Sequence, residues 1–160
     1  MFIETERFGN FDLKDGRIIH FPLGIPGFEE LHLFIILEIS ESRPLYWLQS
    51  VENKYIALPV IIPFDFVDDY YIDVRENELM ELKIEDKNDL LVMNVVVIPE
   101  KIQNMTVNLA SPIIINAREG LGKQIIVDAK ELPVRYPIYT AIMERMKGGA
   151  SNAGSIEKNG

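Results

Sequence analysis

The abundance of β-branched side chains constrains the fold of this chain more than any other feature of its sequence. Isoleucine occurs 22 times and valine 11 times in 160 residues, whereas alanine occurs only seven times. Side chains that branch at Cβ fit the pleated surface of a sheet and lose χ1 freedom in a helix. The apolar residues also come in short runs that Gly, Pro, Asn or charged residues interrupt. We therefore predict strands at residues 2–8, 17–21, 33–37, 45–49, 55–62, 90–98, 113–116 and 123–127.

These strands predict an all-β, mainly antiparallel fold: a small barrel-like domain with one or two short helices. The first helix is expected over residues 73–82, where Asp73 can cap the free N–H groups and carboxylates occupy the first turn. The second is expected over residues 137–146, which begin with a proline and repeat an apolar side chain every four residues. We assign residues 1–146 to one domain and the Gly- and Ser-rich residues 147–160 to a flexible tail.

Two turns punctuate the predicted strands. Residues 25–28 read Ile-Pro-Gly-Phe, with proline at the second and glycine at the third position of a type II turn. Residues 116–122 contain two glycines and predict a hairpin connection.

The residues that most enzymes and metal sites need are scarce. The chain has no cysteine, and its two histidines, His20 and His32, lie twelve positions apart, which is not a zinc-binding spacing. No nucleophile elbow, phosphate-binding loop or dinucleotide-binding motif occurs. We expect a protein that is not an enzyme and has no cofactor. No apolar run approaches the length of a membrane span, and the N-terminus lacks a signal-peptide pattern, so a cytoplasmic protein without membrane contact is expected.

Negative charge is concentrated in one segment. The whole chain has a formal charge of −9, and residues 65–89 alone contain ten acidic and three basic residues, a net charge of −7. Such a chain repels the phosphate backbone of nucleic acids, so we expect a basic protein partner and no direct contact with nucleic acid. Metal binding by these carboxylates is an alternative, but the residue order of a calcium loop is missing. A simple solvated acidic face is the other alternative.

Five sequence segments occur together in a characteristic order. They are residues 21–29 (FPLGIPGFE), 45–50 (LYWLQS), 63–70 (PF followed by DY), 106–113 (TVNLASPI) and 123–126 (KQII). In this order and spacing the chain resembles the flagellar assembly factor FliW family over residues 2–137. We expect residues 1–146 to form a single FliW-like β-barrel domain with a C-terminal helix, although the helix at residues 137–146 lies beyond the matched part. The resemblance implies a barrel-like β domain, which agrees with the strands predicted from the residues.

The resemblance also implies a partner switch without enzymatic activity. Proteins of this family bind flagellin in the cytoplasm as a chaperone. When flagellin is exported, they bind CsrA, a dimeric RNA-binding regulator of translation, and antagonise it allosterically, which relieves repression of flagellin mRNA. We expect a monomer when neither partner is bound. Two alternatives remain at this point: a generic acidic β-barrel interaction module with other partners, and a metal-assisted hydrolase that uses the acidic segment.

The candidate partner-binding residues combine carboxylates with aromatic side chains. The carboxylates are expected to attract a cationic partner and to repel RNA that lies nearby. They belong to Asp65, Asp68, Asp69, Glu76 and Glu78, and the aromatic rings beside them belong to Phe64 and Tyr70.

A further candidate contact is the rigid turn that presents Phe28 and Glu29, although Phe28 could instead fold back onto the core. Gln49, Asn108 and Ser111 are polar residues within the motifs. They are candidates for partner contact or, alternatively, for hydrogen bonding to backbone groups at strand ends and bulges. The lone tryptophan, Trp47, is expected in the core.

Overall fold

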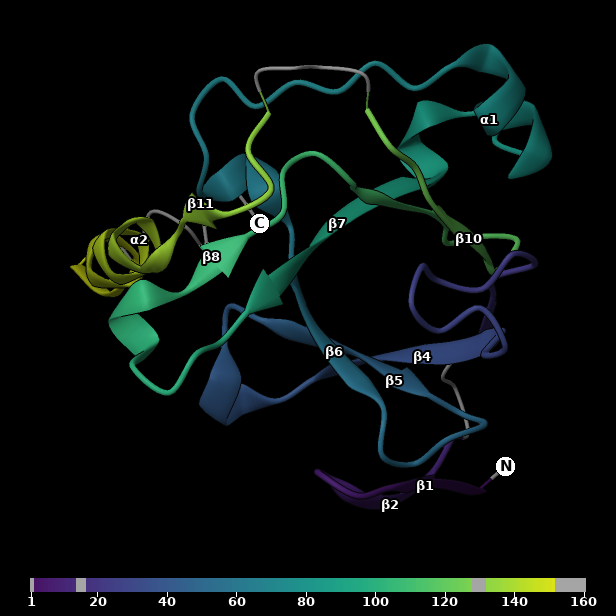
Figure 1. Ribbon diagram of the computed structural model, residues 1–160, viewed down its shortest axis with the longest axis horizontal. Helices are drawn as coiled ribbons and strands as arrows, with labels where there is room; N and C mark the ends of the chain where they lie inside the picture. The colour runs from purple at the N-terminus through teal and green to yellow at the C-terminus, as the bar shows by residue number, and fades with distance from the viewer. Residues whose placement is uncertain (1, 14–16, 128–131, 152–160) are drawn as a thin grey trace.

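Seven strands of the described chain form a closed barrel (Figure 1). The computed structural model describes residues 2–13, 17–127 and 132–151. In spatial order, the barrel strands are β7 (Leu90–Val97), β6 (Ala57–Ile61), β5 (Tyr46–Ser50), β4 (Leu33–Glu38), β3 (Ile19–His20), β10 (Leu121–Gln124) and β9 (Ile113–Asn116), and β9 pairs with β7 to close the ring. Neighbouring strands are antiparallel except β3 and β10, which are parallel. The predicted mainly antiparallel β-barrel is confirmed.

Smaller elements surround the barrel. The hairpin of β1 (Phe2–Thr5) and β2 (Gly9–Asp12) lies beside it, and β8 (Thr106–Val107) and β11 (Tyr136–Pro137) extend the sheet from the end of β7. The described residues also form short 3₁₀ segments, η1 (Ser40–Ser42), η2 (Pro63–Asp65), η3 (Lys87–Asp89) and η4 (Ile102–Asn104). The α-helices in the same ranges are α1 (Glu76–Glu81) and α2 (Tyr139–Ser151).

Strands β7 and β9 are buried on both faces. Met93, Ile113 and Ile115 point into the barrel and pack in its interior cluster. Their neighbours Val92 and Ile114 point outward, yet they are also buried, in a second cluster beneath α1. Because successive strand residues face opposite sides, burial of both faces explains why these segments are continuous apolar runs rather than alternating ones.

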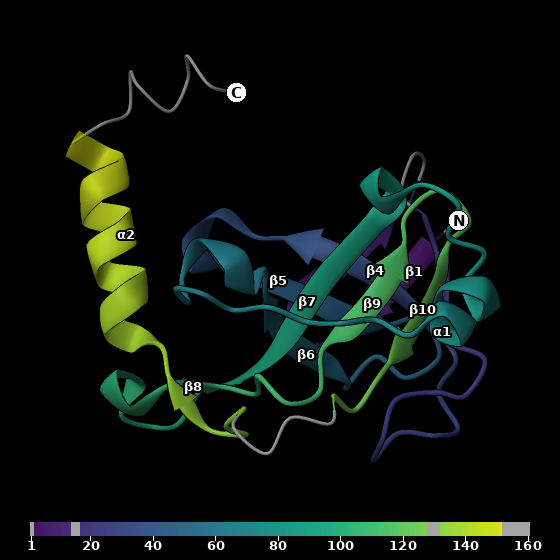
Figure 2. The same cartoon turned by 90° about the horizontal axis from the view of Figure 1, so that it is seen from above.

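The apolar contacts of α2 with the barrel are deepest at and just before its first turn. Ile138 and Ile142 are 0% and 4% exposed, whereas Met143 and Met146 are exposed. Figure 2 shows the helix standing alongside the barrel at one end of the molecule, with its start near β8. The predicted helix over 137–146 therefore exists with different bounds. Pro137 belongs to β11, and the helix continues to Ser151, into the segment predicted as tail. A helix can include the glycines of this segment, although each glycine destabilises it by about 1 kcal/mol relative to alanine. Residues 152–160 of that tail lie outside the described residues.

Helix α1 begins three residues later than expected. Arg75 occupies the N-cap position without a side-chain cap, so the prediction of Asp73 as the cap is wrong. The physical reason is packing, since Val74 lies against the cluster beneath α1 and holds this stretch in an extended path.

Both predicted turns are present, and Trp47 is in the core as expected. Phe28 N–H donates to the Ile25 carbonyl at 2.7 Å, and Gly27 has the positive φ, 92°, that a type II turn needs. Trp47 is 6% exposed, and the guanidinium of Arg7 and the ring of Phe8 cover it from the β1–β2 hairpin.

Candidate partner-binding surface

An extended segment carries many of the predicted site residues across the outside of the barrel. This segment, which we call the strap, comprises residues 66–75 and joins η2 to α1. Figure 2 shows it crossing β7, β9 and β10. The strap includes Asp68, Asp69 and Asp73, all exposed, so the barrel displays a line of carboxylates on this face.

The strap is fixed to the barrel by the buried side chain of Tyr70. Its hydroxyl donates to the Leu109 carbonyl at 2.6 Å and accepts from Nδ2 of Asn94 at 3.1 Å. Nδ2 of Asn94 also donates to the Asn108 carbonyl at 2.8 Å. Burial raises the pKa of Tyr70, so the phenol stays protonated and keeps donating at neutral pH.

This hydrogen-bond network lies at an irregularity between β8 and β9. Both strands pair with β7, where Val96 lies opposite Val107 and Met93 lies opposite Ile113. The segment from Val107 to Ile113 is therefore longer than the segment of β7 that it faces, and it bulges out of the sheet. Asn94 and Tyr70 satisfy carbonyl groups of this bulged segment. The side-chain oxygen of Asn108 accepts from Ala110 N–H at 3.0 Å within the same bulge.

A groove lies between the strap, α1 and the first half of β7. Its volume is about 390 Å³, and its lining is mostly apolar or aromatic. Phe64 and Tyr71 are 49% and 74% exposed at this groove, although both are large apolar side chains. Such exposed aromatic side chains beside a concavity are typical of sites that bind another molecule.

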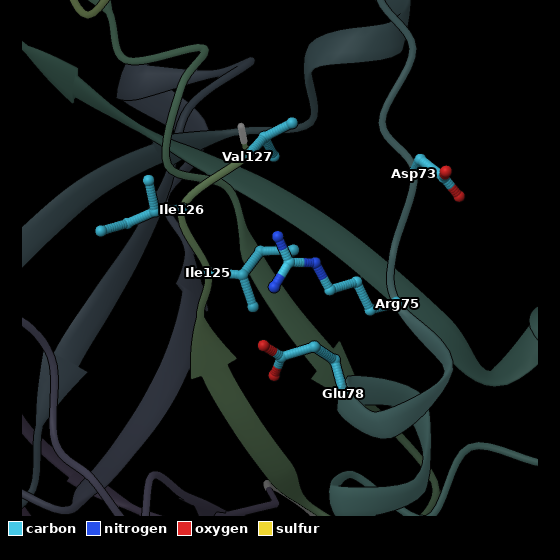
Figure 3. A pocket seen from close by; sticks show the side chains of 6 residues that line it. All are labelled: Asp73, Arg75, Glu78, Ile125, Ile126 and Val127. Atoms are coloured by element: carbon cyan, nitrogen blue, oxygen red, sulfur yellow. The ribbon is translucent and has the colours of Figure 1, made fainter. Parts of the chain in front are cut away.

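A smaller pocket of about 190 Å³ lies on the other side of the strap, between α1 and residues 125–127 (Figure 3). In Figure 3 the guanidinium of Arg75 extends toward Ile125, and the carboxylate of Asp73 points away from the other labelled side chains. Glu78 also lines this pocket, and its Oε2 lies 2.6 Å from Nζ of Lys123.

The five predicted carboxylates fall into two groups. Asp68, Asp69 and Glu76 are exposed, and no ion pair joins them to another residue that the structure describes. Glu78 is 18% exposed and paired with Lys123, and Asp65 lies 3.9 Å from the guanidinium of Arg145. The charge of Glu78 is therefore compensated within the chain, and Asp68, Asp69 and Glu76 supply the outward field.

The paired lysine joins α1 to β10. Nζ of Lys123 also lies 2.7 Å from Glu81, and its hydrogen bonds with Glu78 and Glu81 raise the pKa of Lys123. The structure thus holds α1 beside the barrel by charge as well as by the apolar cluster beneath it.

The sequence matches the model of the FliW protein family over residues 2–138. The chain belongs to the FliW family. The flagellar assembly factor FliW of Thermoanaerobacter pseudethanolicus is 43% identical over 154 residues, which cover 96% of this chain and all of that protein. The protein of the same name from Caldanaerobacter subterraneus subsp. tengcongensis is 44% identical over the same shares. The crystal structure of a flagellar assembly factor FliW superposes with a TM-score of 0.79 at 30% identity, covering 86% of this chain and 96% of that one.

The resemblance predicted from the five motifs is thus confirmed, and the two bacterial FliW relatives extend it. Their matches leave at most a few residues of the chain uncovered, so most of α2 lies within the FliW-like region.

Several FliW motif residues have a structural place in the barrel. Gln49 is buried and donates through Nε2 to the carbonyls of Ser50 and Ile56 at 3.0 and 3.1 Å. It therefore holds the loop between β5 and β6, and Asn108 holds the bulge between β8 and β9, as their alternative interpretation predicts. Ser111 is half-buried, and its carbonyl accepts from the Gln124 side chain at 2.9 Å.

The turn motif separates its two predicted contact residues. Phe28 is half-buried and packs against the barrel interior, as its alternative interpretation predicts, while Glu29 is exposed. The motif therefore exposes its carboxylate fully and its aromatic ring only in part.

Sequence reasoning missed Tyr71, Asp73 and Lys87, which line the groove. Residues 70–75 alternate between inward and exposed positions, so the apolar–polar alternation of residues 72–75 is the sequence signal that places Tyr70 inward and Tyr71 outward. The proximity of Lys87 to the strap depends on the long-range path of α1 and η3.

Among the described residues, no group of three His, Asp or Glu side chains could hold a metal ion. In that same part of the chain, no helix is long and apolar enough to cross a membrane.

Proposed function

We propose that this FliW-family protein is a cytoplasmic flagellar assembly factor that binds flagellin as a chaperone and, when flagellin is exported, binds and antagonises CsrA. Membership of a family whose relatives are named flagellar assembly factors supports the first part of this proposal. The observation that carries the second part is the group of exposed carboxylates of Asp68, Asp69 and Glu76, which have no compensating cation among the described residues.

The physical argument concerns the charge of the partner. A protein that binds RNA must display cationic surface, so an anionic face can dock beside that surface and oppose the approach of phosphate. At physiological salt this repulsion acts over about 8 Å, the Debye length. The strap therefore needs to dock close to the path of the RNA, and no cofactor or covalent chemistry is required.

The first experiment is a titration of the purified protein with flagellin and, separately, with CsrA. Both are expected to bind, and CsrA is expected to bind more weakly as the salt concentration rises. If neither protein binds, the chain is an interaction module with other partners. A rise in melting temperature with divalent cations alone would instead favour a metal-dependent activity, because a ligand that binds only the folded state stabilises it.

A charge-reversal variant tests the strap directly. Asp68→Lys, Asp73→Lys and Glu76→Lys change three exposed carboxylates of the strap and of the start of α1. They leave alone Asp69, whose φ is 59°, and also Asp65 and Glu78, which are paired with Arg145 and Lys123. We expect at least a tenfold loss of CsrA affinity at low salt and no change in flagellin affinity.

The matched control reverses three exposed carboxylates elsewhere, at Glu4, Glu30 and Glu119. It has the same net charge as the strap variant and is expected to keep CsrA affinity within about threefold. If both variants lose the same CsrA affinity, the net charge of the protein and not the position of the strap determines binding.

The partner switch itself is tested by competition. A complex with CsrA is formed first, flagellin is then added, and both the release of CsrA and its binding to RNA are followed. The proposal predicts that flagellin binds the protein and releases CsrA from it, and that the released CsrA binds RNA again.

A further inference from the structure

The groove beside the strap is built from one continuous part of the chain. All ten of its lining residues lie between Phe64 and Val92. Phe64 and Tyr71 stand at its exposed side, Leu79 contributes from α1, and Leu90 and Val92 contribute from β7. The strap, α1 and β7 therefore form one concave apolar surface.

The elements that form this groove are rich in acidic residues, of which Asp68, Asp69 and Glu76 are exposed and unpaired among the described residues. The stretch that supplies its lining includes residues 65–89, with ten acidic and three basic side chains. Asp73 lines the groove itself, and Lys87 is the one cation among the lining residues. An apolar floor within an anionic surround selects an occupant with an apolar centre and positively charged flanks.

The groove walls are anchored to the barrel. On one side, the Tyr70 hydroxyl is hydrogen-bonded to Leu109 and Asn94. On the other, Nδ2 of Asn116 donates to the carbonyls of Leu82 and Lys83 at 2.8 and 3.1 Å, which holds the end of α1. A groove whose walls are fixed before binding loses little conformational entropy when it is filled.

We infer that this groove receives an apolar side chain of a Lys- or Arg-flanked segment of the cationic partner, CsrA. The inference rests on the proposed function and adds to it the place and the chemistry of the contact. Charge brings the partner to this face, and burial of Tyr71 and Phe64 then supplies the contact area that charge alone does not.

Two substitutions with opposite expected effects test the inference, with purified CsrA as the probe. Tyr71→Ala removes the most exposed ring of the groove and is expected to weaken CsrA binding at least tenfold. Because the contact is apolar, the dependence of affinity on salt should keep its slope. Lys87→Glu removes the cation that a positively charged segment would meet and is expected to strengthen binding at least threefold at low salt.

Matched controls come from exposed residues outside the groove. Tyr55 is 67% exposed, so Tyr55→Ala removes a ring of the same kind from another surface. Lys101 is exposed, so Lys101→Glu changes the net charge by the same amount as Lys87→Glu. Both controls are expected to stay within twofold of the unaltered protein.

The possible results separate the inference from the function on which it rests. If the unaltered protein binds CsrA but Tyr71→Ala binds equally well, the groove assignment is wrong and the proposed function stands. If Lys87→Glu weakens binding, the occupant is not cationic, which also overturns the inference. If Tyr71→Ala weakens flagellin binding and leaves CsrA binding unchanged, the groove belongs to the other partner. If CsrA does not bind the unaltered protein at all, the proposed function fails first.

Discussion

Lys83 takes a left-handed backbone conformation, with φ of 57°, directly at the point where the Asn116 side chain caps its carbonyl oxygen. The N–H groups of Lys83 and Ile84 donate to the carbonyls of Met80 and Leu79, so the end of α1 is a Schellman motif. This motif normally has glycine at the left-handed position. A side chain with a Cβ at this position strains the backbone, and the hydrogen bonds of Asn116 hold it there.

Replacement of Lys83 by glycine should therefore stabilise the protein. Relief of the left-handed strain outweighs the extra freedom of glycine in the unfolded chain, and we expect a gain of about 0.5–1 kcal/mol. Urea unfolding measures it as a shift of the midpoint at constant slope. Lys83→Ala removes the same charge but keeps a Cβ, so it should give none of this gain. A gain equal to that of glycine would show that the lysine charge, not the backbone, is the cause.

The buried pair of Tyr70 and Asn94 should be important for stability. Tyr70→Phe leaves the Leu109 carbonyl without its donor and the Asn94 amide with the Asn108 carbonyl as its remaining acceptor, at an expected cost of about 1–3 kcal/mol. Tyr71→Phe, on the neighbouring exposed ring, should change the free energy of unfolding by less than about 0.5 kcal/mol.

A double-mutant cycle with Tyr70→Phe and Asn94→Ala should show a coupling energy of at least about 0.5 kcal/mol, because the two side chains are in direct contact. Strictly additive losses would contradict the role of this hydrogen bond in fixing the strap.

Two glycines of the turn motif provide a matched pair. Gly24 and Gly27 both have positive φ, but a Cβ at Gly24 would lie 2.5 Å from the Glu29 carbonyl oxygen, whereas a Cβ at Gly27 meets nothing within 4 Å. We expect Gly24→Ala to lower the free energy of unfolding well beyond the roughly 1–2 kcal/mol that left-handed strain alone costs. Gly27→Ala should cost only that strain. Thermal unfolding of the two variants compares them, and equal losses would mean that the loop yields to the added methyl group.

The stability of the protein in acid should depend on Glu52. Hydrogen bonds from the backbone N–H groups of His32 and Leu33 lower the pKa of this carboxyl below its ordinary value of 4.5. A group with a lowered folded-state pKa stabilises the protein above its unfolded pKa, and the contribution disappears as the pH falls through the folded-state value. Unfolding free energies measured from pH 6 downward should therefore fall less steeply for Glu52→Gln. Glu30→Gln, which removes an exposed carboxylate nearby in sequence, is the matched control for the loss of one negative charge.

Much of the barrel could be predicted from local sequence. Runs such as 113–116 are so rich in isoleucine that strand is the expected structure whatever surrounds them, and Gly27 alone marks its turn. The start of α1 could not be predicted, because Val74 packs against β-strand residues that are distant in sequence.

The candidate site shows the same division between local and long-range information. The anionic character of residues 65–89 is readable from composition, whereas the pairing of Glu78 with Lys123 joins positions far apart along the chain. The hydrogen-bond partners of Tyr70 are equally invisible, since Asn94 and Leu109 become its neighbours only when β7, β8 and β9 have assembled.

The parallel pairing of β3 with β10 has a consequence for biosynthesis. His20 lies opposite Leu121, about a hundred residues later in the chain. Ribosomes add roughly 5–20 residues per second, so β3 is made several seconds before its neighbour exists. One edge of β3 then has no partner strand until nearly all of the barrel sequence has emerged. Ring closure is therefore a late and cooperative event, and a nascent chain that stops before β10 has no complete barrel to offer a partner.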